Sequence, residues 1–225
     1  MINFDEMVDN YLAREHRPKG MGRYYPSEIG SCLRKIWYSY KYPQEVKPEL
    51  LKIFEVGNIM HDFVVKVLQS ERNPHIELVK SEFPFKVEME DFVISGRIDN
   101  LILVKADNKE VLVEVKSKKS IDFMKEVAAA NVAQLQLYMH VLGVHDGVLL
   151  YIDKTNLMTK VFDVKYNEKQ ALAVLNRFKK LHEHLKNGKT PIPEARALQE
   201  TIWMCRYCEY HDRCYSETPK NDDWM

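Results

Sequence analysis

Two acidic residues interrupt apolar stretches of the sequence fifteen positions apart, Asp99 in ISGRIDNLIL and Glu114 in VLVEVKSKK. Lys116 follows Glu114 by two residues, so both side chains project from one face of a strand predicted over residues 110–117. For this spacing alone, an exposed acid–base pair on an edge strand is the simplest interpretation. The second acid favours another one, because two inward carboxylates on adjacent strands repel each other unless a cation lies between them.

The chemistry that such an arrangement would support is the hydrolysis of a phosphodiester. Carboxylate oxygens are the ligands that Mg²⁺ and Mn²⁺ prefer in proteins. An ion of this kind lowers the pKa of bound water and neutralises charge on a phosphate. Lys116 would lie beside it, placed to hold the attacking water or to stabilise the charged transition state. We therefore predict that Asp99, Glu114 and Lys116 are catalytic.

These motifs resemble a known family. The residues GRID, fourteen further residues and then EVK resemble the D…ExK core of the PD-(D/E)XK nuclease superfamily, with Ile98 in place of the proline. His61 in EVGNIMHDFV resembles a histidine of the RecB-like branch of that superfamily. The resemblance implies that His61, Asp99 and Glu114 bind the metal, with the Val115 carbonyl as an additional ligand. Without it, His61 reads as an ordinary, partly exposed helix residue.

A second motif of the RecB-like branch lies in QLQLY, where Gln134 and Tyr138 are four residues apart and so share one face of a helix. The resemblance implies that this pair orients the catalytic lysine and contacts DNA. The alternative is plain helix packing by Tyr138 with a solvated Gln134.

Four cysteines, Cys32, Cys205, Cys208 and Cys214, include three within ten residues, in the spacing C-x2-C-x5-C. In a reducing cytoplasm such a set predicts a metal site rather than two disulfides. The layout resembles the iron–sulfur RecB-like nucleases, which implies a 4Fe-4S cluster that joins the C-terminal segment to the N-terminal helices, with a 2Fe-2S form also compatible. Zinc is the alternative, in which His211 could replace a cysteine.

The stretch SEIGSCLRKIWY resembles the first-cysteine motif of the CRISPR-associated exonuclease family. This resemblance implies metal-dependent 5′ to 3′ cleavage of single-stranded DNA, trimming of spacer precursors and the CRISPR integrase complex as a partner. Two alternatives remain open. One is an iron–sulfur nuclease of recombination or replication, viral or helicase-associated. The other is a non-catalytic, zinc-stapled nucleic-acid-binding module.

Binding of DNA would need a local basic patch, because the 33 basic and 33 acidic residues balance. Lys118 and Lys119 follow the catalytic strand, and Arg34 and Lys35 follow the first cysteine. We predict that these four residues bind DNA, although lysines after a strand often belong to a solvated turn. The oligomeric state is not encoded in any feature of the sequence.

The chain of 225 residues predicts one nuclease domain, with an N-terminal helical part over 1–48, a core over 49–187 and a cluster-binding segment and tail over 188–225. No apolar run is long enough to span a membrane and the N-terminus is unlike a signal peptide, so we expect a cytoplasmic protein with no membrane partner. The order of elements predicts an α/β fold with a mixed central sheet flanked by helices. Helices are predicted over 3–16, 49–70, 122–142 and 167–187, with one more before Pro43, and strands over 76–89, 92–104, 110–117, 147–153 and 158–165.

Overall fold

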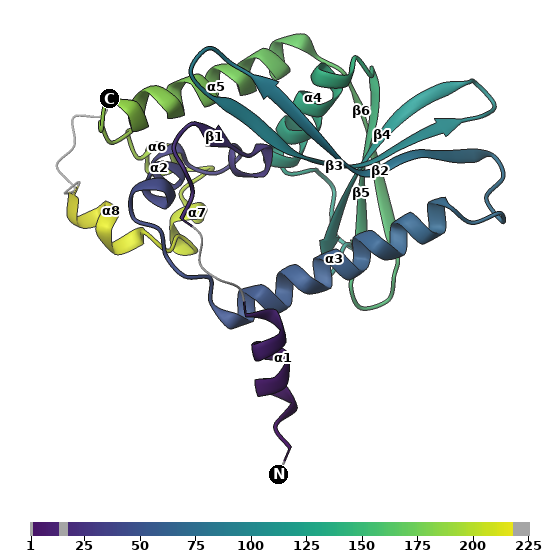
Figure 1. Cartoon of the computed structure of the whole chain (residues 1–225), viewed down its shortest axis with the longest axis horizontal. Helices are drawn as coiled ribbons and strands as arrows, with labels where there is room; N and C mark the ends of the chain where they lie inside the picture. The colour runs from purple at the N-terminus through teal and green to yellow at the C-terminus, as the bar shows by residue number, and fades with distance from the viewer. Residues whose placement is uncertain (1, 14–17, 218–225) are drawn as a thin grey trace.

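The structure is a computed structural model that describes residues 2–13 and 18–217. A twisted sheet lies between α3 on one face and α4 and α5 on the other (Figure 1). Its helices are α1 (Phe4–Leu12), α2 (Leu33–Lys41), α3 (Pro48–Leu68), α4 (Ala129–Leu142), α5 (Glu168–Lys186), α6 (Glu194–Ala197), α7 (Trp203–Arg206) and α8 (His211–Glu217), with a 3-10 turn η1 (Pro26–Glu28). Its strands are β1 (Arg23–Tyr24), β2 (Ile76–Glu88), β3 (Val93–Val104), β4 (Lys109–Lys118), β5 (Asp146–Asp153) and β6 (Thr159–Lys165).

The sheet is mixed, as the sequence predicted. Its strand order is β1-β3-β4-β5-β6, with β2 on the other edge of β3. The pairs β1–β3 and β4–β5 are parallel and the remaining pairs are antiparallel. The predicted α/β class with a mixed sheet between helices is therefore confirmed.

The helix predicted over 122–142 begins only at Ala129. Residues 121–128 are irregular instead, with a turn at 122–123, and the side chain of Lys160 donates to the Met124 carbonyl. Ala128 has an extended backbone, with φ −66° and ψ 129°, so these residues cannot continue into the helix. The helix predicted over 3–16 is described as Phe4–Leu12, and residues 14–17 lie outside the described residues.

Strand β3 pairs with β2 along its length and shares its other edge between two strands. On that edge β1 pairs with Val93 and Ile94, and β4 pairs from Asn100↔Val113 to Val104↔Lys109. The next step of this register would place Asp99 opposite Glu114, but the ladder ends before it. The strands thus separate at the two acids, which opens space between them for side chains.

Successive side chains of β4 point to opposite faces of the sheet, so the strand contributes to two hydrophobic cores. Val113 and Val115 belong to the smaller core with Val64 of α3. Leu112 belongs to the larger core with Leu135 of α4. Glu114 and Lys116 follow Leu112 at even spacing, so they face the α4 side of the strand.

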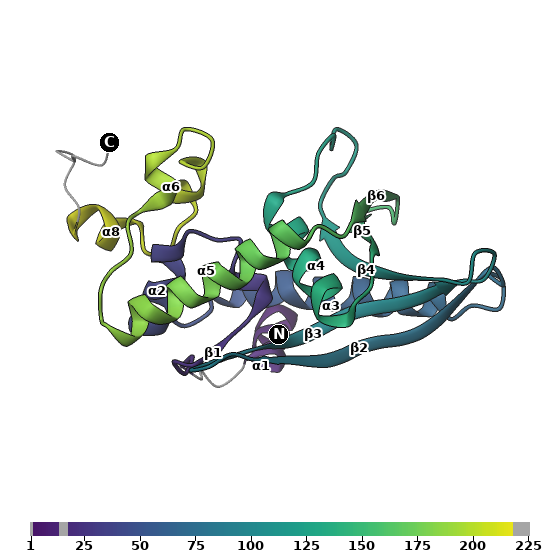
Figure 2. The same cartoon turned by 90° about the horizontal axis from the view of Figure 1, so that it is seen from above.

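The C-terminal helices α6, α7 and α8 lie beside α2, which is distant from them in sequence (Figures 1 and 2). Glu194 of α6 accepts a hydrogen bond from the Leu33 N–H at 2.7 Å, and it also pairs with Arg177 of α5. The side chain of Arg177 donates in turn to the Ile29 carbonyl at 2.9 Å. These bonds join the segment before α2, α5 and the C-terminal region into one unit. None of the helices in the described part of the chain combines the length and the apolar character that crossing a bilayer requires.

Gly30 is the point where the segment before α2 crosses the start of α4. A Cβ at position 30 would lie 2.1 Å from the Cβ and 2.6 Å from the Cα of Ala130. We expect Gly30→Ala to lower the free energy of unfolding by about 1–3 kcal/mol, because backbone must move to relieve the overlap. Denaturant unfolding measures this loss. Gly20→Ala is the control, since a Cβ there meets nothing within 4 Å, and equal stability of the two variants would contradict the prediction.

Candidate active site

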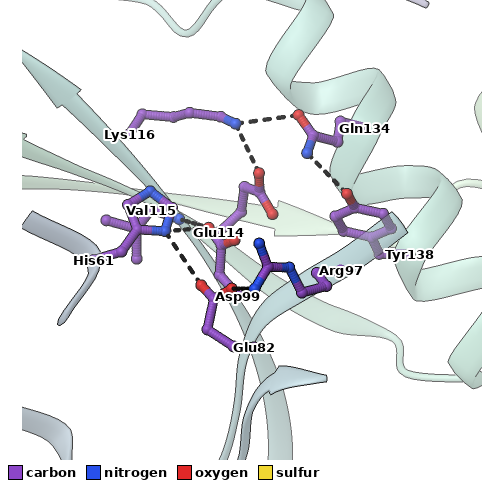
Figure 3. A network of polar contacts seen from close by, with 9 residues as sticks. All are labelled: His61, Glu82, Arg97, Asp99, Glu114, Val115, Lys116, Gln134 and Tyr138. Carbon is purple, nitrogen blue, oxygen red and sulfur yellow. Dashed lines mark hydrogen bonds and ion pairs between the residues drawn. The ribbon is translucent and has the colours of Figure 1, made fainter. Parts of the chain in front are cut away.

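Asp99 lies where β3 and β4 separate, and its carboxylate replaces the missing ladder partner. Its Oδ2 accepts a hydrogen bond from the Val115 N–H at 2.8 Å (Figure 3). The residue is 8% exposed, and this burial raises the pKa of the carboxyl above its ordinary value, although the Val115 N–H opposes the shift. A carboxylate held here is costly without a nearby cation.

Glu114 is the most buried acid of the site, at 2% exposure. Its Oε1 accepts a hydrogen bond from Lys116 Nζ at 2.7 Å, while its Oε2 is buried without a hydrogen-bond partner. Burial is the main cause that raises the pKa of Glu114, the charge of Asp99 adds to it, and Lys116 opposes it. A buried carboxylate oxygen without a hydrogen-bond partner, beside a second carboxylate, is a metal ligand that a bound cation would satisfy.

Lys116 is held by two neighbours. Its Nζ donates to Glu114 Oε1 and to Gln134 Oε1, the latter at 3.1 Å. Burial lowers the pKa of Lys116, but the carboxylates of Glu114 and Asp99 outweigh it and the net shift is upward. Lys116 is therefore a charged donor at neutral pH.

Gln134 and Tyr138 complete this chain from α4. The Gln134 Nε2 donates to the Tyr138 hydroxyl at 2.9 Å, which turns the amide oxygen toward Lys116 (Figure 3). The Tyr138 ring packs edge-on against Phe85 of β2, with centroids 5.1 Å apart. The sequence predicted that this pair shares a helix face near the lysine, and the structure brings it there.

His61 reaches the acids from α3. Its Nδ1 lies 3.6 Å from Asp99 Oδ2 and 3.6 Å from Glu82 Oε1. In the described part of the chain, His61, Glu82 and Asp99 form the one group of three potential metal ligands whose atoms all lie within 4.8 Å of one another. The oxygen and imidazole donors fit a divalent ion such as Mg²⁺ or Mn²⁺. Val115, predicted as a carbonyl ligand, contacts the site through its N–H.

Glu82 was missed by reasoning from the sequence. It lies in SEFPFKVE, where polar and aromatic residues alternate as they do in any half-exposed strand. No local signal distinguishes it from Glu77 or Glu88 of the same strand. Only the pairing of β2 with β3 brings it to the site, between the pairs Ser81↔Asn100 and Phe83↔Ile98.

The four predicted DNA-binding residues fall into two places. Lys118 and Lys119 are exposed at the end of β4. Lys35 pairs with Glu209 at 2.9 Å. Arg34 is only 6% exposed, and its Nε donates to the Pro191 carbonyl. Its guanidinium is turned into the protein, so Arg34 is the least exposed of the four residues, and its contact with DNA stays a prediction.

The four cysteines line one cavity of about 280 Å³, between the start of α2 and the C-terminal helices. All four are free thiols, and burial raises the pKa of Cys205 and of Cys208, with the other thiols raising that of Cys205 further. Arg34 Nη1 lies 3.9 Å from Cys214 Sγ. Within the described residues, no three of the sulfurs belong to a group as compact as 4.8 Å. The cavity gathers Cys32, Cys205, Cys208 and Cys214, a donor set that fits a thiolate-bound metal centre.

Comparisons with known proteins agree with this architecture. The family model described as PD-(D/E)XK nuclease superfamily matches residues 8–215. The solved structure of SSO0001 is similar to this chain with a TM-score of 0.61 and 19% identity, covering 95% of this chain and 94% of that one. The structure of LHK-Exo in complex with dAMP is similar with a TM-score of 0.51 and 10% identity, over 75% and 90% of the two chains. At these identities the two structures bear on the fold. No curated protein matches the chain by sequence.

The raised pKa of Glu114 predicts a pH-dependent stability in the absence of divalent ions. The native state keeps a proton that the unfolded state releases near the ordinary value of 4.5, so stability is lost as the pH rises from there through the raised pKa. Glu114→Gln cannot ionise and removes this loss. Between about pH 5 and about pH 8, wild type should lose stability relative to the variant, by up to about 1.4 kcal/mol per pH unit.

Urea unfolding of both proteins in a chelator, at each end of that range, measures the difference. A gap between wild type and Glu114→Gln that is independent of pH would contradict a raised pKa for Glu114. Glu110→Gln controls for the loss of an acid from the same strand, since Glu110 is exposed on β4.

Proposed function

Since the chain belongs to the PD-(D/E)XK nuclease superfamily, we propose that it is a metal-dependent exonuclease that degrades single-stranded DNA from the 5′ end. The observation that carries this proposal is the buried pair Asp99 and Glu114, whose charges a single lysine only partly neutralises. A protein that only bound nucleic acid would have no need to bury two carboxylates side by side. The preference for DNA, for single strands and for the 5′ end rests on the family resemblance of the motifs.

The residues divide the work between holding an ion and stabilising charge. His61, Asp99 and Glu114 would hold the divalent ion, which supplies, when bound, a water of lowered pKa and charge neutralisation on the phosphate. Lys116 carries a full positive charge and donates hydrogen bonds, so its role is to stabilise the developing charge and to orient the water, not to accept a proton.

Gln134 and Tyr138 act as positioning residues for this lysine. Two hydrogen bonds in series tie the Lys116 ammonium to α4. The Tyr138 ring is itself packed against Phe85 of β2. The two hydrogen bonds therefore hold the Lys116 ammonium in a fixed position relative to the sheet and α4. Preorganisation of this kind lowers the cost of reaching the transition state.

The four cysteines would hold a 4Fe-4S cluster in their cavity. The loop that this cluster closes runs from Cys32 to Cys214 and so spans most of the chain. Such a link would staple the C-terminal segment, residues 188–225, to the N-terminal helical part. Zinc remains the alternative for the same thiolates, and His211 also lines the cavity.

We place the activity in CRISPR adaptation, as the trimming of spacer precursors with the CRISPR integrase complex as partner. This rests on the resemblance of SEIGSCLRKIWY to the first-cysteine motif of that exonuclease family. A nuclease of recombination or replication would use the same site. Co-purification with the integrase, against co-purification with a helicase, distinguishes the two.

The activity test uses linear single-stranded DNA labelled at the 5′ or the 3′ end, with Mg²⁺ or Mn²⁺. We expect early release of the 5′ label and progressive shortening of the 3′-labelled strand. Glu114→Gln and Lys116→Ala should lose at least about 100-fold in rate, because the first removes a ligand of the ion and the second removes the ammonium that stabilises the developing charge. Circular single strands, linear duplexes and RNA of the same sequence test end dependence, strandedness and sugar specificity.

Glu110→Gln is the matched control and should cleave as wild type does, since this acid is exposed on the same strand. Cleavage by Glu114→Gln and Lys116→Ala at the wild-type rate would reject the assigned site. Cleavage of circles as fast as linear strands would reject exonuclease activity.

The cluster predicts a coloured protein. Purified without oxygen, wild type should absorb near about 400 nm and contain iron. Cys205→Ser should lose the absorbance and unfold at a lower temperature, because the link between the chain ends is lost. Metal analysis decides between the candidates, and a colourless protein with one equivalent of zinc would contradict the cluster.

A further inference from the structure

Glu82 has a backbone conformation that its place in a strand does not explain. Its φ is +46°, in a region that residues with a Cβ avoid. The neighbouring pairs Ser81↔Asn100 and Phe83↔Ile98 are regular. A strained residue inside a paired strand persists only where the surroundings over-determine it, and such residues gather at functional sites.

The strain accompanies a side chain that points to the acidic site. Figure 3 shows Glu82 below His61 and Asp99, with its carboxylate toward the imidazole. Its Oε1 lies 3.6 Å from His61 Nδ1, and the same nitrogen lies 3.6 Å from Asp99 Oδ2. The buried Oε2 of Glu114, another acid of this site, has no hydrogen-bond partner among the described residues.

The spacing of these atoms is too long for direct hydrogen bonds and leaves room for a cation between them. Hydrogen bonds between an imidazole nitrogen and a carboxylate would be about 2.7–3.2 Å long, shorter than either separation. Neighbouring ligands of Mg²⁺, with bonds of about 2.0–2.1 Å, lie about 2.8–3.0 Å apart at right angles. The two separations of 3.6 Å are longer than this, so a bound ion would draw His61, Glu82 and Asp99 closer together.

The other oxygen of Glu82 has a different partner. Arg97 Nη1 lies 3.4 Å from Glu82 Oε2. Arg97 is 70% exposed and stands two residues before Asp99 on β3. With Oε2 directed to the guanidinium, Oε1 is the oxygen available to an ion, so the arginine would favour coordination through one oxygen.

We propose that Glu82 is a further ligand of the divalent ion, contributed by β2 in addition to His61, Asp99 and Glu114; this rests on the proposed function of the site. The proposal explains the left-handed backbone at position 82, because this conformation turns a strand side chain toward the gap between β3 and α3. Each of three strands and one helix would contribute a side-chain ligand.

Binding of Mn²⁺ to the full chain, followed by electron paramagnetic resonance of the free ion, tests this without relying on activity. We expect Glu82→Gln to weaken Mn²⁺ binding about 10- to 100-fold, a range typical for groups that support a metal site. Glu77→Gln, an exposed acid on the same strand, should bind as wild type does. Glu114→Gln should also bind weakly.

Glu82→Gly separates coordination from backbone strain. Glycine adopts a positive φ without steric strain, so this variant should unfold at a temperature no lower than that of Glu82→Gln in a chelator, yet bind Mn²⁺ as weakly as Glu82→Gln. Tight binding by Glu82→Gly would overturn the proposal, because the defect of Glu82→Gln would then come from the backbone.

The remaining outcomes separate the role of Glu82 from the proposed function of the site. Wild-type affinity in both Glu82 variants, with weak binding by Glu114→Gln, would overturn the role of Glu82 and leave the proposed function intact. No binding by wild type, or wild-type affinity in Glu114→Gln, would overturn both.

Discussion

Two carboxylates in one buried space, on Asp99 and Glu114, impose the constraint on which the rest of the site depends. Both pKa values are raised by burial, and Lys116 satisfies only one oxygen of Glu114. Fully buried acids of one sign are unfavourable unless cations and hydrogen bonds compensate them. The arrangement therefore costs stability in the ion-free protein, and it fits a nuclease in which a divalent ion supplies the missing charge.

The fold creates that space by dividing one edge of β3. The strand pairs with β1 at its start and with β4 at its end, and the acids lie where the second pairing stops. Asp99 then bonds to the Val115 N–H. A longer β3–β4 ladder would close the gap, so an incomplete sheet is what makes the chemistry possible.

The cysteine cavity is a second assembly, built from the start of α2 and the C-terminal helices, with Ala130 of α4. None of the residues of the acidic site lines it. Glu194 and Arg177 already join α2, α5 and α6 by hydrogen bonds, so this part has a protein framework apart from any metal. A thiolate-bound centre would add a covalent link to that framework.

Local patterns in the sequence determined the strands and long helices, the α/β class and the positions of Asp99, Glu114 and Lys116, because a charge inside an apolar strand stands out over a few residues. The Gln134–Tyr138 pair was equally readable, since a helix brings residues four apart to one face. Only the tertiary structure decided that Glu82 joins the site and that Arg34 is buried at the cysteine cavity. Both outcomes depend on contacts between segments distant in sequence, and no local periodicity encodes which side chain such contacts bury or bring to a neighbour.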